Sequence, residues 1–124
     1  MKMYEVLELQ NLYNSIANIK LSLKTTYKFT RLMKRAEEEI SFYQEKFREI
    51  VEEYGVKEDS EYKLTPDGQS IVIIPGKEVE CNNKLAELRN LDVQIDGIKF
   101  SIEELEKIDV SVSELSCLMS LIED

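Results

Sequence analysis

The chain has 124 residues and a net charge of −9, from 25 acidic and 16 basic residues, and it contains no histidine. Its length fits one domain, and its 43% hydrophobic content is typical of a folded globular protein rather than a disordered one. So acidic a chain repels phosphates, which argues against general nucleic-acid binding. The lack of histidine removes the commonest general base and the commonest zinc ligand.

Cysteine usage and hydropathy give three further expectations. Cys81 and Cys117 are the only cysteines, and their wide separation predicts reduced, partly buried structural thiols. No apolar run approaches about 18 residues and no signal-peptide pattern is present, so we expect neither a membrane span nor export. The sequence shows no glycine-rich phosphate loop and no carboxylates at a defined metal-binding spacing. We therefore expect no cofactor, metal or catalytic residue, and a small metal-dependent hydrolase is the weakest alternative.

Residues 4–19 are predicted to form the first helix. Val6, Leu9, Tyr13 and Ile16 share one face, which Leu12 and Ile19 widen. Residues 20–24 follow as a short connection, and Thr25 or Thr26 is the expected cap of the next helix.

Residues 26–54 are predicted to form a long second helix that ends at Gly55 in a left-handed cap. Apolar residues recur along it at alternating spacings of four and three, as in a coiled-coil heptad. This seam consists of Phe29, Met33, Ala36, Ile40, Tyr43, Phe47, Ile50 and Tyr54. The first helix is about half as long and reaches only to about Ile40. The distal seam therefore needs cover from the C-terminal half of the chain or from a second copy, and we favour some self-association.

The C-terminal half is predicted to hold a small β-hairpin and short helices. Residues 61–74 read as a hairpin around the turn Thr65–Gly68, and residues 78–90 as a weaker helix. Residues 91–95 and 98–100 are strand candidates around Asp96-Gly97, an Asp-Gly hairpin signal.

Two capping boxes mark the last helices. Ser101 with Glu104 opens one helix, and Ser111 with Glu114 opens the other. The apolar face of the helix that Ser111 opens is predicted to consist of Leu115, Leu118, Met119 and Ile122.

One segment reverses the charge of the chain. Residues 9–36 contain no acidic residue, and Lys24, Lys28, Arg31 and Arg35 follow one another at spacings of 4, 3 and 4 beside the seam. Together with Tyr27, which could stack on a base, this basic stripe is the candidate anion or partner site. Alternatively, the stripe neutralises acidic surface from the C-terminal half or from a neighbouring subunit.

The layout resembles a family of small tailed-phage proteins of uncharacterised function. The resembling elements are the connection KLSLK (20–24), a long helix ending in EYG (53–55), the DG turn at 67–68, the stretch NKLAELRNLDVQI (83–95) and the closing pattern of 102–122. This chain has Ser22 where the family usually has a proline. The resemblance implies a phage origin and a non-enzymatic role, and it carries no active-site residue to transfer.

These observations predict a mainly α, α+β protein of one domain, residues 1–124. An N-terminal helical hairpin (1–55), with a long coiled-coil-like second helix, would carry a small α+β portion (56–124) with a β-hairpin and short C-terminal helices. We expect a phage binding or assembly component that acts as a homo-oligomer and contacts another protein, in the host cytoplasm or in the virion. The alternative is an inhibitor of host defence, acting as an acidic decoy of nucleic acid or as a sponge for a nucleotide signal at the basic stripe.

Overall fold

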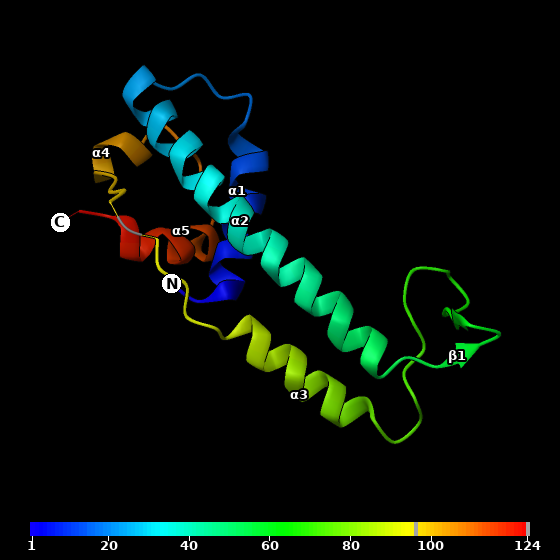
Figure 1. Ribbon diagram of the computed structural model, residues 1–124. Helices are drawn as coiled ribbons and strands as arrows, with labels where there is room; N and C mark the ends of the chain where they lie inside the picture. Colours follow the sequence, from blue (N-terminus) through cyan, green and yellow to red (C-terminus); the bar gives the residue numbers. More distant parts are fainter. Residues whose placement is uncertain (96, 124) are drawn as a thin grey trace. The chain divides into compact units, whose positions relative to one another are not determined.

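The computed structural model describes residues 1–95 and 97–123, and its elements confirm a mainly helical α+β fold (Figure 1). The helices and strands are α1 (Met3–Ile16), α2 (Leu23–Glu53), β1 (Lys57–Glu58), β2 (Glu61–Tyr62), α3 (Glu78–Arg89), α4 (Ile102–Leu105), α5 (Val112–Leu118) and the 3₁₀ turn η1 (Met119–Leu121).

Within this fold the chain forms two compact units. Unit 1 comprises residues 1–41 and 92–124, and unit 2 comprises residues 42–91. The division falls inside α2, so this one continuous helix supplies its first half to one core and its second half to the other.

In unit 1, α1 packs against α5 (Figure 1). The inner face of α1 is buried as predicted at Val6, Leu9, Leu12 and Ile16, and Met3 extends it. The helix ends three residues earlier than expected, so Ile19 is exposed and does not widen the apolar face. The Ser15 hydroxyl donates to the Leu12 carbonyl oxygen, a local bond that competes with helix continuation near this end.

The start of α2 corrects the predicted cap. The helix begins at Leu23, and the Ser22 hydroxyl accepts a hydrogen bond from the Thr25 amide at 3.2 Å. Ser22 therefore caps the helix, while Thr25 and Thr26 lie inside its first turn.

The predicted seam of α2 is shared between the two cores. Phe29, Met33 and Ile40 are buried in unit 1, where the Phe29 ring lies 4.5 Å from that of Phe100, centroid to centroid. In unit 2, Tyr54 is buried with Cys81 and Leu85, and Phe47 and Ile50 pack against that cluster. Tyr43 is half-buried, and the Arg89 side chain donates to its hydroxyl. The chain's own residues thus contribute cover to the distal seam, so seam length no longer argues for a second copy.

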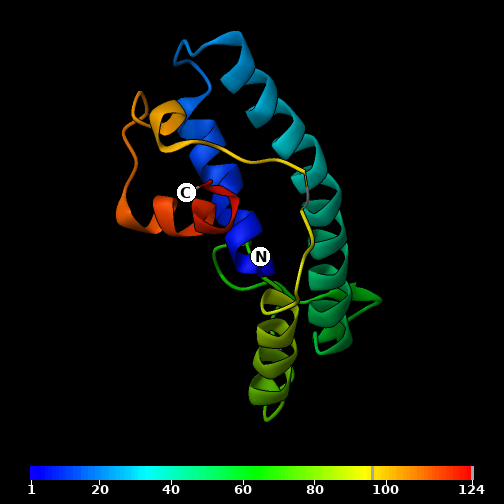
Figure 2. The ribbon, with the colours of Figure 1, turned by 90° about the vertical axis from the view of Figure 1, so that its left-hand side faces the viewer.

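Unit 2 places α3 alongside the C-terminal part of α2 (Figures 1 and 2), with Lys84 contacting Glu53 at 3.2 Å. The predicted turn at Thr65–Gly68 is present, where the Gly68 amide donates to Thr65 and Leu64 bridges Ile71.

The regular two-stranded sheet lies just before that turn. There β1 pairs antiparallel with β2 across Asp59 and Ser60, both with positive φ. This hairpin was not predicted, because Asp-Ser lacks the glycine that usually marks such a turn.

Gly55 follows α2 but does not adopt the predicted left-handed conformation. The residue is needed for close approach instead. A Cβ atom there would lie 2.7 Å from Ile71 Cγ2 and 2.9 Å from Tyr62 Cδ1.

Among residues 91–95 and 97–100, no strand pair forms the hairpin that was predicted around Asp96-Gly97. Asp96 lies outside the described residues, and the segments on either side pair elsewhere. Val93 exchanges backbone hydrogen bonds with Met1, and Phe100 exchanges them with residues 121 and 123. Within unit 1, these two segments therefore hold the two ends of the described chain in place by backbone pairing.

Both predicted capping boxes are present, at Ser101–Glu104 and at Ser111–Glu114. The predicted apolar face of the last helix is wrong in part, because Leu115 and Met119 are exposed while Cys117 and Leu121 are buried with Leu118. The chain tightens into a 3₁₀ turn at Met119, which changes the spacing of inward positions to three.

Candidate functional site

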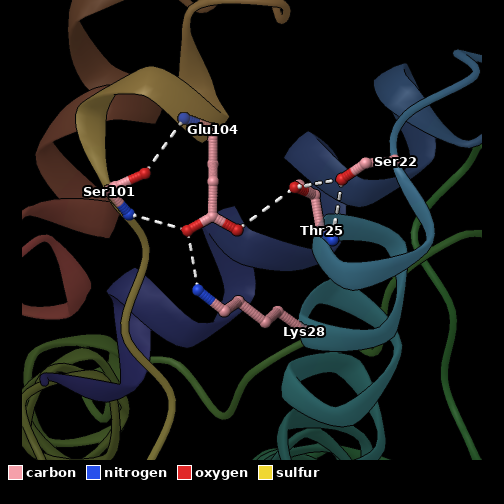
Figure 3. Close-up of polar contacts among 5 residues, drawn as sticks. All are labelled: Ser22, Thr25, Lys28, Ser101 and Glu104. Atoms are coloured by element: carbon pink, nitrogen blue, oxygen red, sulfur yellow. Dashed lines mark hydrogen bonds and ion pairs between the residues drawn. The ribbon is translucent and has the colours of Figure 1, made fainter.

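The basic stripe meets its main internal partner at Glu104. Ser101 caps α4, and its capping box fixes the carboxylate of Glu104 near the start of α2. Figure 3 shows Lys28 and Thr25, both from the first turns of α2, pointing toward this carboxylate.

The carboxylate of Glu104 accepts three hydrogen bonds (Figure 3). Oε1 accepts from Lys28 Nζ at 2.6 Å and from the Ser101 amide at 3.0 Å, and Oε2 accepts from Thr25 Oγ1 at 3.1 Å. The Ser22 hydroxyl in turn donates to Thr25 Oγ1 at 3.0 Å. The network therefore ties α4 to the N-terminal cap of α2 across 76 to 79 residues of sequence.

These bonds favour the charged form of Glu104. The Lys28 ammonium, together with the Ser101 amide and the Thr25 hydroxyl, lowers the pKa of Glu104 from 4.5 to about 2 despite partial burial. Lys28 Nζ also lies 5.7 Å from the centre of the Phe100 ring, a favourable cation–π distance.

A polar pocket of about 460 Å³ surrounds this network. Three lysines line it, Lys24, Lys28 and Lys107, and so do three glutamates, Glu103, Glu104 and Glu123. The charges balance, and Glu104 already occupies the place where an external anion would meet Lys28. For Lys28 the geometry favours the interpretation that the stripe neutralises acidic surface of the same chain.

The other stripe residues lie outside this network. Tyr27 is 61% exposed, and the Arg31 guanidinium lies 5.8 Å from the centre of its ring. Arg35 is exposed but engaged in an interaction of its own. Of the five predicted site residues, Lys24 and Lys28 line this polar pocket together, and Tyr27, Arg31 and Arg35 are not part of its lining.

A second pocket is apolar and was missed from the sequence. The α4–α5 pocket has a volume of about 230 Å³ and is lined by Ile102, Leu105, Leu115, Met119 and Ile122. Ile102 is 59% exposed and Met119 is 62% exposed. Two of the residues assigned to the buried face of the last helix, Leu115 and Met119, thus form part of an open apolar surface.

Acidic side chains flank this pocket along the chain. Glu103, Glu106 and Glu123 each adjoin a pocket residue in sequence and are exposed. Glu103 and Glu123 also line the polar pocket around Glu104, whereas Glu106 does not. An apolar pocket with such flanks fits a partner that offers apolar side chains among cations.

Unit 2 holds a further pocket of about 320 Å³, lined mainly by apolar side chains that include Phe47, Val51, Ile73 and Leu85. Cys81 also lines it, and burial raises the pKa of the Cys81 thiol. Both cysteines are buried and unpaired, as predicted.

Among residues 1–95 and 97–123, no three histidine, cysteine or carboxylate side chains are grouped to hold a metal ion. Within these residues, none of the helices combines the length and the apolar composition that a membrane-spanning segment requires. Comparison with protein-family models, with curated proteins and with solved structures found no match in any of the three.

Proposed function

We propose that the chain is a non-enzymatic binding protein that works as a homo-oligomeric assembly component. The observation that carries this proposal is the open α4–α5 pocket, whose lining includes the exposed apolar side chains of Ile102, Leu115 and Met119. A pocket of this kind in an otherwise charged surface is typical of a protein-binding site, because covering it removes apolar area from water.

Covering the pocket also contributes free energy to association. Burying one large apolar side chain contributes about 1.5–3 kcal/mol, and Met119 and Ile102 both remain available for such burial. The acidic flanks then select the partner by charge.

The phage setting is part of the same proposal and is supported by the whole-chain resemblance described above. It places the protein in the host cytoplasm during assembly or in the finished virion. Mass spectrometry of purified particles tests the virion role, since the protein should be present at a fixed ratio to the other virion proteins.

Sedimentation velocity tests the assembly role. The wild-type chain should sediment as a species larger than one chain at micromolar concentration. The pocket variant Leu115→Lys/Met119→Lys should sediment as a monomer, because two cations in the pocket forbid apolar contact. A wild-type chain that stays monomeric overturns the proposal.

A second candidate function is supported by the three lysines of the Glu104 pocket. In this hypothesis the chain inhibits host defence by sequestering a nucleotide signal, which would displace Glu104 from Lys28. A thermal-shift screen with cyclic dinucleotides tests it, since a ligand at 100 times its dissociation constant adds about 2.7 kcal/mol of stability. Lys28→Glu should abolish the shift, and no shift with any nucleotide rejects the hypothesis.

A further inference from the structure

The first turns of α2 present a second exposed apolar surface in unit 1. Leu23 is 86% exposed and Tyr27 is 61% exposed. Their spacing of four residues places them on one side of the helix. We call this pair the Leu23–Tyr27 face.

Cations surround the Leu23–Tyr27 face. Lys20, Lys24, Arg31 and Lys34 are exposed, and no acidic residue occurs between residues 9 and 36. The Arg31 guanidinium lies over the Tyr27 ring, so charge and aromatic surface are presented together.

This face is the chemical complement of the α4–α5 pocket. Residues 102–123 contain six acidic residues and one lysine, the reverse of the balance on the first turns of α2, and of the six Glu104 is already paired with Lys28. In one chain both surfaces stay open, since Leu23 and Met119 are each more than half exposed. Each surface therefore lacks inside the chain the cover that the other could provide.

We propose that the Leu23–Tyr27 face of one copy docks in the α4–α5 pocket of a second copy. This inference rests on the proposed homo-oligomeric function and names the partner surface. Leu23 and Tyr27 enter the pocket beside Met119, and the lysines and Arg31 approach Glu106, which is exposed and lies outside the polar pocket around Glu104.

The proposed contact joins two different patches, so it is heterologous. Each added copy leaves one face and one pocket open, and growth continues as a chain or closes into a ring. Screening by salt should weaken the contact, because the charges around it remain near solvent.

The test uses two variants of the full chain and their mixture. The face variant is Leu23→Glu/Tyr27→Glu, and the pocket variant is Leu115→Lys/Met119→Lys. All four positions are exposed, so both variants should fold, which circular dichroism verifies. Val79→Glu is the matched control, since Val79 is 71% exposed and lies in unit 2.

Each variant alone should lose self-association, with the dissociation constant raised at least about 30-fold. Mixed in equal amounts, they should form a species of one chain of each kind, because the pocket variant still has its face and the face variant its pocket. Val79→Glu should associate as the wild type does.

Two results overturn the inference without touching the proposed function. One is a face variant that self-associates like the wild type. The other is a mixture that stays monomeric although each variant folds. A monomeric wild-type chain contradicts both the inference and the proposed function.

Discussion

At the scale of single residues, Glu104 carries the most interactions of any side chain described above. It completes the capping box of α4 and also neutralises Lys28 at the start of α2. The sequence predicted the capping box, because Ser101 and Glu104 lie three residues apart. It could not predict the pairing with Lys28, because local sequence does not specify which of several lysines lies opposite Glu104 in the fold.

The variant Glu104→Gln measures what this charge contributes. Glutamine keeps the shape of the side chain and can still accept from the Ser101 amide, but it loses the charge that Lys28 meets. We expect the free energy of unfolding at neutral pH to fall by about 1–3 kcal/mol. Urea unfolding followed by circular dichroism measures this change.

The pH dependence of the same pair follows from the lowered pKa. Because the folded pKa of Glu104 lies below its ordinary value, its contribution is complete above about pH 4.5 and is lost as the pH falls toward about 2. The stabilities of the wild type and Glu104→Gln should therefore converge over that range.

Glu114→Gln is the matched control for both experiments. Glu114 occupies the same capping-box position, opposite Ser111. Among the described residues, the ion pairs of lysine side chains do not include Glu114. Its replacement should cost clearly less than Glu104→Gln, and equal losses would assign the effect to the capping boxes instead of to Lys28.

The thiols give a second prediction at this scale. Burial and nearby glutamates raise the pKa of Cys117 to about 11, and burial also raises that of Cys81. Since the thiolate is the reactive form, neither cysteine should react appreciably with a disulfide reagent at neutral pH in the folded protein. Denaturant should release both, and fast reaction of either in the native state would contradict this placement.

At the scale of elements, periodicity predicted the helices well. The long second helix, the helix at 78–90 and the two capped C-terminal helices are all present, because their apolar spacing and caps are local signals. The strands were harder to predict. Residues 91–95 and 98–100 pair with the two ends of the described chain, which no short-range turn signal reveals.

Gly55 shows how a glycine can be required for a reason other than its backbone angle. Gly55→Ala should lower the free energy of unfolding by about 1–3 kcal/mol, because the new Cβ atom crowds Ile71 and Tyr62. In an Ile71→Ala background the cost should be smaller, since the nearer obstructing methyl group is gone. Equal costs in both backgrounds, measured by urea unfolding, would contradict crowding by Ile71.

The packing partner of the α2 seam is also a question at the scale of elements. Heptad spacing alone does not distinguish a core shared with the same chain from a coiled coil with another. Here Phe29 and Tyr54 are buried within different units of the same chain. The proposed association therefore rests on the two exposed surfaces of unit 1 and not on the seam.

At the scale of the whole molecule, the main feature is the uneven distribution of charge, with a basic segment at residues 9–36 in an otherwise acidic chain. The basic segment meets an acidic residue of the same chain at Lys28 and Glu104, and its outer side is exposed around Tyr27. The sequence indicated that the basic stripe pairs either with acidic residues of the same chain or with an external partner. It could not predict which residues of the stripe do which. The structure shows the internal part, and the proposed docking assigns the external part to a second copy.

Oxidation of Met119 by hydrogen peroxide tests most directly whether another chain covers the α4–α5 pocket. Met119 is 62% exposed, whereas Met3 and Met33 are buried and serve as internal references. If copies dock there, mass spectrometry should show Met119 of the wild type oxidising more slowly as the protein concentration rises. In the face variant Leu23→Glu/Tyr27→Glu, which keeps the pocket but should stay monomeric, Met119 should oxidise at the same fast rate at every concentration. Oxidation of Met119 at one fast rate across the whole concentration range would contradict the account.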